Sequence, residues 1–272
     1  MKTMLVALAC TFLFPAIAVA AVADVRLSST IGPIDAGIVP LLAESYEQKT
    51  GVKVVFEGAG TGATLEKAKN GGFDMVMVHA RSLEDKFVAE GWGLDRRDVM
   101  YNDFVILGPK NDPVGIKGMP SATDAFTKLA QAEAPFVTRG DMSGTHVKEM
   151  EVWKSAALEP AGAWYDLFAD GNKGNKATTL YANAKQAYVM MDRATYLTLK
   201  NEISLVPLVE GDKILLNFIA VIAVNPAKLS DINSDGAKAF MDWLVSDEAQ
   251  TIIKNFGVDK YGSPLFFPNA QK

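Results

Sequence analysis

Short apolar runs alternate with amphipathic stretches along most of the chain. The run Met75–Val78 contains no polar position, which is typical of a strand buried in a parallel sheet. Apolar residues at helical spacing then predict a first helix with Pro33 in its opening turn and its end at Gly51. Strands are predicted at 25–29, 52–57, 75–78, 99–101, 104–107, 136–138, 188–190, 205–209 and 215–224, and later helices at 63–70, 82–90, 122–132, from 145, 179–185, 193–200 and 234–256. This alternation predicts the α/β class.

Two apolar strands, 104–107 and 215–224, bracket a middle segment that has its own α/β pattern. We therefore expect two lobes, each a mostly parallel sheet flanked by helices, joined by two hinge crossings. Lobe one would comprise 24–107 plus 215–272, and lobe two 108–214. A hinged cleft between such lobes is a common place for a small ligand.

The first 23 residues have the pattern of a signal peptide. Lys2 supplies the positive start, a mostly apolar run reaches Val19, and small residues at 18, 20, 21 and 23 offer cleavage positions between 20 and 24. The run is shorter than the roughly 20 residues that a transmembrane helix needs. We expect export to the periplasm.

Composition narrows the chemistry that the mature chain can perform. Cys10 is the only cysteine, and we do not expect a lipid anchor there because too little apolar sequence precedes it. Once the signal peptide is removed, no thiol is left for a disulfide or a nucleophile. The formal net charge of −5 becomes −6 without Lys2, which disfavours nucleic acid as a partner. An anion site must therefore be built locally.

The first candidate site segment follows the first strand. Ser29 and Thr30 stand where a helix begins, and unpaired N–H groups and the positive end of the helix dipole face outward at such a junction. Their hydroxyls could donate to an anion bound at the helix start. Ordinary capping of the helix by Ser or Thr is the alternative.

The second segment is Arg139–His146, which also connects a strand to a helix. Arg139 offers a planar fork of donors that matches an oxyanion, and Asp141 can orient the guanidinium from its other side. Further donors come from the hydroxyls of Ser143 and Thr145, while Gly144 permits close approach of the backbone. A purely structural Arg–Asp pair is the alternative.

The third segment is the glycine-rich turn 58–63. It resembles a dinucleotide-binding turn, but the acidic residue expected at the end of the next strand is absent. We interpret it as a further anion-facing turn in which Thr61 and Gly62 contribute, or as a turn that needs glycine for its backbone alone. His79 and His146 are the only histidines and no cluster of metal ligands is visible, so we predict no metal site.

With these segments in place, the chain resembles the periplasmic tungstate-binding proteins of ABC uptake transporters (TupA type). The resemblance covers essentially the whole mature sequence and rests on segments 76–80, 86–91, 100–106, 139–146, 208–212 and 223–226. It implies a type II periplasmic-binding-protein fold, tungstate or molybdate as ligand, no cofactor, and an inner-membrane permease as partner. It also implies ligand contacts from a middle-lobe loop that contains Asn175 and Lys176. We expect a monomer without enzymatic activity.

The family carries Thr-Thr-Thr-Ser after its first strand, where this chain has Ser29-Thr30-Ile31-Gly32. Ser29 and Thr30 keep their hydroxyls, whereas Ile31 and Gly32 can offer only backbone N–H groups. Phosphate keeps a proton near neutral pH, and phosphate-binding relatives place an Asp after the third strand; here His79 follows. A pocket of donors favours a fully deprotonated dianion, and the resemblance favours tungstate over molybdate, sulfate or phosphate. A secreted phosphate or sulfate ester hydrolase and an oxyanion sensor are the alternatives of another class.

Overall fold

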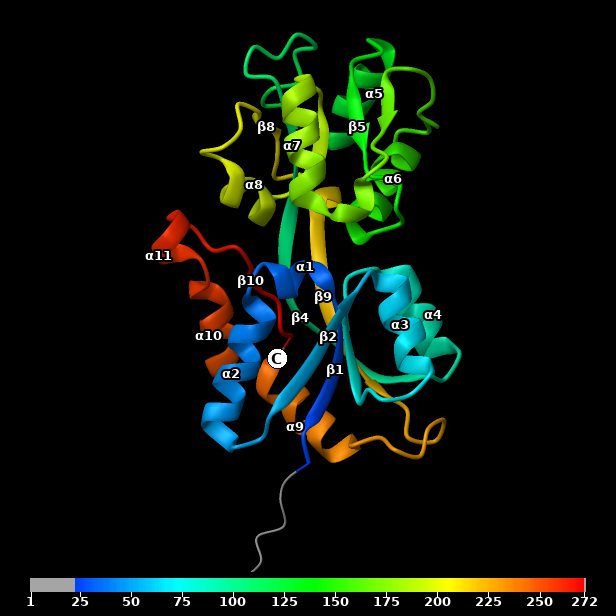
Figure 1. The fold of residues 1–272 in the computed structure, drawn as a ribbon, viewed down its shortest axis with the longest axis vertical. Coiled ribbons are helices and arrows are strands. Elements are labelled where there is room, and N and C mark those ends of the chain that lie inside the picture. The colour runs from blue at the N-terminus through cyan, green and yellow to red at the C-terminus, as the bar shows by residue number, and fades with distance from the viewer. Residues whose placement is uncertain (1–22, 272) are drawn as a thin grey trace, which may run out of the picture.

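The computed structural model describes residues 23–271, so Cys10 and nearly all of the predicted signal peptide lie outside the described residues. The described chain forms two bodies that are connected by two strands, β4 (Gly93–Gly108) and β9 (Leu216–Val224) (Figure 1). The predicted α/β class and the two-lobed architecture are confirmed. Within the described range, no helix is long and apolar enough to cross a membrane.

Lobe one is built on a sheet with the strand order β10-β4-β9-β3-β1-β2. Strands β1 (Val25–Thr30), β2 (Val54–Ala59) and β3 (Met75–Val78) are mutually parallel, whereas β9 runs antiparallel to β3 and β4. The other elements of this lobe are α1 (Ile31–Asp35), α2 (Ile38–Thr50), α3 (Thr61–Lys69), α4 (Arg81–Ala89), α9 (Ser234–Leu244), α10 (Asp247–Asn255), α11 (Val258–Tyr261) and β10 (Phe267–Pro268). Each of the three parallel strands leads into a helix, so helix starts gather at one end of the sheet.

Lobe two repeats this strand-to-helix arrangement on a smaller scale. Strands β5 (Phe136–Thr138) and β6 (Tyr165–Leu167) pair in parallel, while β7 (Val189–Asp192) and β8 (Val206–Val209) pair antiparallel with β4. The helical elements are α5 (Ala122–Gln131), α6 (Gly144–Ser155), η1 (Gly171–Lys173), α7 (Asn175–Lys185), α8 (Arg193–Leu199) and η2 (Lys213–Leu215). Strand β5 is followed by α6 and strand β7 by α8, which again places helix starts at the strand ends.

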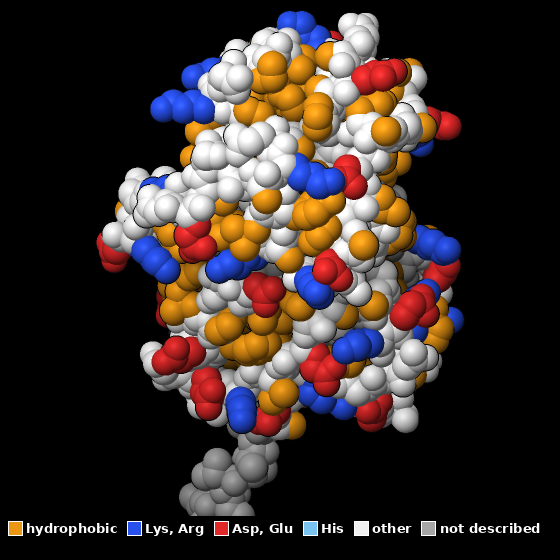
Figure 2. All heavy atoms as spheres, turned by 45° about the horizontal axis from the view of Figure 1, so that its top comes forward, with side chains coloured by type: hydrophobic (Ala, Val, Ile, Leu, Met, Phe, Trp, Pro, Cys, Tyr) orange, Lys and Arg blue, Asp and Glu red, His pale blue; other side chains and the backbone are white. Residues whose placement is uncertain are grey.

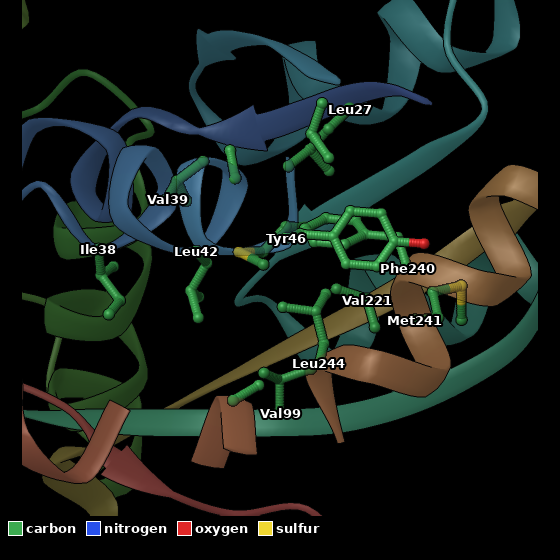
Figure 3. Packing of buried hydrophobic residues seen from close by; sticks show 14 of the residues in the cluster. Leu27, Ile38, Val39, Leu42, Tyr46, Val99, Val221, Phe240, Met241 and Leu244 are labelled. Atoms are coloured by element: carbon green, nitrogen blue, oxygen red, sulfur yellow. The ribbon is translucent and has the colours of Figure 1, made fainter. Parts of the chain in front are cut away.

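Burial on both faces of the sheet explains the uninterrupted apolar runs. On β3, Met75 and Met77 belong to the hydrophobic cluster under α2 and α9, while Val76 and Val78 belong to the cluster under α3 and α4. Figure 3 shows part of the first cluster, in which side chains of α2 and α9 meet the strands. Burial of this much apolar surface holds the helices, and with them the helix starts, in fixed positions.

Each lobe has its own hydrophobic clusters, although Ala194 of α8 in lobe two belongs to the cluster of lobe one. Along β4 the cluster changes from lobe one to lobe two between Met100 and Phe104, and in the second crossing it changes between Ile219 on β9 and Leu215 at the end of η2. The short stretches between these residues are the parts of the crossings that neither core holds. The chain boundaries expected at 107/108 and 214/215 stay a prediction.

Several predicted element boundaries are wrong for identifiable reasons. The first helix is divided at Gly37, whose left-handed backbone (φ 92°) interrupts it. The last long helix is divided at Ser246, whose side chain accepts the N–H of Ala249 and starts α10. The two predicted strands at 99–101 and 104–107 are one strand of 16 residues, β4. Finally, α7 begins at Asn175 rather than at Thr179.

Candidate functional site

A cleft of about 540 Å³ lies between the lobes and is lined by residues of both. Lobe one contributes the starts of α1 and α3, and lobe two contributes the starts of α6, α7 and α8. The volume falls within the range of small-ligand sites. The predicted site residues that line this cleft are Thr30, Thr61, Arg139, Ser143, Gly144, Thr145, Asn175 and Lys176.

The lobe-one wall presents two buried hydroxyls. Thr30 ends β1 and Thr61 opens α3, and their side chains are 1% and 2% exposed. The strands β1 and β2 pair in parallel with Thr30 opposite Ala59, which brings the two helix starts together. The Oγ1 atoms of both threonines are buried without a hydrogen-bond partner. Such atoms carry a free-energy penalty that a bound acceptor would remove.

The guanidinium of Arg139 lies in the lobe-two wall with 10% of its side chain exposed. Nη2 donates to Asp141 at 2.5 Å, Nη1 donates to Oδ1 of Asn175, and Nε is buried without a partner. Burial raises the pKa of Asp141, but the hydrogen bond from Ser143 and the charge of Arg139 outweigh it and hold that pKa below its usual value. Asp141 therefore stays ionised and accepts the hydrogen bond from Nη2 of Arg139; its orienting role stays a prediction.

The start of α6 carries three further predicted residues. Ser143 caps the helix by accepting the N–H of His146 at 3.4 Å, and its side chain also hydrogen-bonds Asp141. Thr145 is 5% exposed and donates to Oδ1 of Asn175 at 3.1 Å. Gly144 stands between them and has no side chain to cover the first-turn N–H groups.

Asn175 connects the helix starts of lobe two. Its Oδ1 accepts hydrogen bonds from both Arg139 and Thr145, and its Nδ2 donates to Asp192 at 2.6 Å. Asp192 caps α8 by accepting the N–H of Thr195 at 2.8 Å. Lys176 follows on α7, but its side chain is 66% exposed and its Nζ lies 4.0 Å from Glu202. Asn175 thus fixes the positions of the Arg139, Thr145 and Asp192 side chains relative to one another. Lys176 adds only a charge that solvent screens.

Helix starts contribute positive electrostatic potential to the cleft. The residues that precede α1, α3 and α7 make no side-chain capping hydrogen bond, so backbone N–H groups of these first turns carry no side-chain acceptor. Together with α6 they aim the positive ends of four helix dipoles at one region. Figure 2 shows basic and acidic side chains intermingled over one face of the molecule.

Two of the predicted ligand residues do not line the cleft. Ser29 is fully buried within the sheet, and its hydroxyl donates to the carbonyl oxygen of Thr30 at 3.1 Å. Alternation along β1 explains this, because neighbouring residues of a strand face opposite sides. Gly62 lines a separate, small hollow between α3 and α4. We therefore leave Ser29 and Gly62 out of the ligand set.

The sequence interpretation missed several cleft residues: His79, Asn102, Asp192 and Asn217. Asn102 and Asn217 lie on the crossing strands, where a polar residue in an apolar run was the available signal. His79 follows β3, and its position after a buried strand was also visible. Among residues 23–271, no group of three or more His, Cys, Asp or Glu side chains is arranged to hold a metal ion.

The fold and the cleft are those of a two-lobed binding protein. The sequence profile of the PBP superfamily domain matches residues 18–248. The tungstate-binding protein TupA of Peptoclostridium acidaminophilum is 40% identical over 251 residues, which cover 92% of this chain and 87% of that protein. The chain belongs to the PBP superfamily and, within it, to the TupA family.

Solved structures agree with this assignment. The tungstate-binding protein TupA from Desulfovibrio alaskensis is 37% identical, covers 92% of this chain and 100% of its own, and superposes with a TM-score of 0.82. The structure described as the tungstate ABC transporter from Geobacter sulfurreducens is 41% identical, with 86% and 98% covered and a TM-score of 0.77. The likeness thus includes both lobes.

Proposed function

We propose that this chain captures tungstate as a fully deprotonated tetrahedral dianion and delivers it to the permease of an ABC transporter. The observation that carries the proposal is a set of buried donors without partners in one cleft: the hydroxyls of Thr30 and Thr61 and the Nε of Arg139. A single oxyanion between the lobes would satisfy all three. The names of the relatives support tungstate as that oxyanion.

The donor character of the cleft favours a dianion without a proton. The carboxylates of Asp141 and Asp192 already accept hydrogen bonds from Arg139, Asn175 and Thr195, which disfavours a further hydrogen bond from hydrogen phosphate. Molybdate has the same charge and shape as tungstate and is the alternative within this proposal. Each hydrogen bond to a charged partner contributes about 1.5–3 kcal/mol, so a few of them support tight binding after the costs of closure.

The proposal also covers the location, the oligomeric state and the closure of the protein. The chain acts in the periplasm as a monomer without catalysing a reaction, and the lobes 24–107 plus 215–272 and 108–214 close on the anion. Closure removes water from the cleft and strengthens each donor–oxyanion contact. The closed form presents both lobes to the permease.

A thermal-shift titration of the mature protein tests the choice of anion. Tungstate, molybdate, sulfate and phosphate are compared at equal concentration and ionic strength. A ligand at a hundredfold excess over its Kd adds about 2.7 kcal/mol to the free energy of unfolding, which raises the Tm by several degrees. We expect the largest rise with tungstate. A larger rise with phosphate than with tungstate would overturn the proposal.

Calorimetry on an arginine variant tests the site. Arg139→Gln removes the buried charge, and we expect the affinity for tungstate to fall about ten- to a hundredfold. Arg97→Gln is the matched control, because Arg97 pairs with Asp95 and Asp242 on the far side of lobe one. Equal affinities of Arg139→Gln and wild type would remove Arg139 from the ligand set.

A further inference from the structure

His79 reaches from lobe one to the anion-binding helix start of lobe two. It follows β3, whereas Gly144 is the first residue of α6. A side-chain carbon at Gly144 would overlap Cε1 and Nε2 of His79 and would lie 2.8 Å from Nδ1. The imidazole ring therefore rests directly on the backbone of Gly144, across the cleft that both residues line.

The orientation of this ring is fixed by both crossing strands. Nδ1 of His79 lies 2.8 Å from Oδ1 of Asn217 on β9, and Nδ2 of Asn217 donates to Oδ1 of Asn102 on β4 at 2.6 Å. Because the amide nitrogen of Asn217 is used toward Asn102, its oxygen faces the ring and selects the tautomer that carries the proton on Nδ1. The ring is thus tied to the two segments that join the lobes.

The absence of a side chain at Gly144 is a matter of space rather than of backbone conformation. Its φ is not positive, so the backbone there is open to any residue, and alanine would favour the helix more than glycine does. The neighbouring glycine, Gly140, has a φ of 63° and does need glycine for its backbone. At position 144 the atoms in the way belong to His79.

We propose that His79 is a positioning residue for the closed state: its ring seats the start of α6, and so places the donors of that helix at a set distance from Thr30 and Thr61. The inference rests on the proposed function, because the contact of His79 with Gly144 would align the donors of lobe one and the donors of lobe two on one anion. The ring, held by Asn217, acts as a stop against which lobe two closes. It need not touch the anion to set this geometry.

A double-mutant cycle tests the contact. The wild type, Gly144→Ala, His79→Ala and the double variant are titrated calorimetrically with sodium tungstate. Overpacking at the contact should lower the affinity of Gly144→Ala about tenfold or more, since the added methyl group meets the ring. Removal of the ring makes room, so we expect the double variant to bind as well as His79→Ala does, with no further loss from the alanine at position 144.

The matched control uses the other histidine. His146 lies two residues from Gly144, but its Nδ1 accepts the N–H of Met142 within lobe two, and it is not among the residues that line the cleft. His146→Ala should therefore fail to rescue Gly144→Ala. Circular dichroism confirms folding of each variant, and His79→Ser replaces His79→Ala if the latter does not fold.

Each outcome of the double-mutant cycle either supports or overturns the inference about His79. Losses that add in the double variant would mean that Gly144 is small for the anion rather than for His79, which overturns this inference and leaves the proposed function intact. A wild type that binds neither tungstate nor molybdate overturns the proposed function and this inference with it. A double variant that binds as well as His79→Ala, without any such relief of Gly144→Ala by His146→Ala, supports the inference.

Discussion

Asp141 joins Arg139 to the start of α6: one carboxylate oxygen accepts Nη2 of Arg139 at 2.5 Å, and the other accepts the N–H of Ser143 at 3.1 Å. An amide has a single acceptor oxygen, so Asp141→Asn must lose one of these two bonds. We expect the variant to bind tungstate about tenfold more weakly, because Arg139 is then poorly oriented or the helix start shifts. Isothermal titration calorimetry measures the change.

Asp85→Asn is the control for this variant. Asp85 pairs with Arg81 at 2.7 Å on the exposed side of α4, where an ion pair contributes little. We expect no change in affinity from it. An unchanged or higher affinity in Asp141→Asn would show that Arg139 is oriented without the carboxylate.

Thr61→Val should change affinity and stability in opposite directions. The Oγ1 of Thr61 is buried without a partner, so its replacement by a methyl group removes a desolvated polar atom from the ligand-free protein. We expect the free energy of unfolding without anion to stay level or rise by about 1 kcal/mol, while tungstate affinity falls about tenfold or more. Urea unfolding and calorimetry measure the two quantities on the same sample.

Thr64→Val, one turn later on α3, should behave in the reverse manner. Thr64 is fully buried, and its Oγ1 donates to the carbonyl oxygen of Ser29 at 3.1 Å. Valine leaves that carbonyl without this donor, which should lower the free energy of unfolding by about 1–3 kcal/mol. A Thr61→Val protein that lost stability and kept its affinity would place the hydroxyl outside the site.

Asn175→Asp should damage binding more than Asn175→Ala does. Nδ2 of Asn175 donates to Asp192 at 2.6 Å, so a second carboxylate at this position would repel Asp192 and also place negative charge beside the anion. Alanine loses the hydrogen bonds to Arg139, Thr145 and Asp192 but adds no negative charge. We expect about a tenfold larger loss of tungstate affinity for the aspartate variant at neutral pH. Equal losses in the two variants would mean that the anion lies far from Asn175.

The strands and much of the lobe-two site follow from local sequence. Met75–Val78 is fully apolar because both faces of β3 are buried, and a short apolar run of this type has few alternatives to a buried strand. The Arg139–Thr145 segment contains its own orienting partner, Asp141, at a separation of two residues. Such short-range patterns can be recognised without knowledge of the fold, because the interacting groups are close in the chain.

The parts that the sequence did not predict depend on distant partners. Ser29 and Thr30 both carry hydroxyls, and only the register of β1 in the sheet decides that Thr30 faces the cleft while Ser29 is enclosed. Asn175 was expected only from the family resemblance, because its partners Arg139 and Asp192 lie 36 and 17 residues away in the chain. His79 gains its place from a contact between lobes, which no local pattern encodes.

Glu149 should make the stability of the protein depend on pH. It lies on α6 with 2% exposure, and its Oε1 accepts Tyr165 at 2.6 Å and Trp153 at 3.1 Å. Burial outweighs these hydrogen bonds and raises its pKa from 4.5 to about 7. The native protein therefore binds this proton more tightly than the unfolded chain does, so the free energy of unfolding should fall as pH rises from about 4.5 to about 7 and level off above that.

Urea unfolding of Glu149→Gln between pH 4.5 and 8 measures this contribution. Glutamine resembles the protonated acid and keeps an acceptor for Trp153 and Tyr165, so the variant should lack the decline, which in the wild type amounts to at most about 3 kcal/mol. Glu151→Gln is the control, because Glu151 is exposed on the same helix and pairs with Lys148. It should keep the wild-type decline. Parallel pH profiles for the wild type and Glu149→Gln would mean that the buried carboxyl titrates near its ordinary pKa, and that its hydrogen bonds offset the cost of burying its charge.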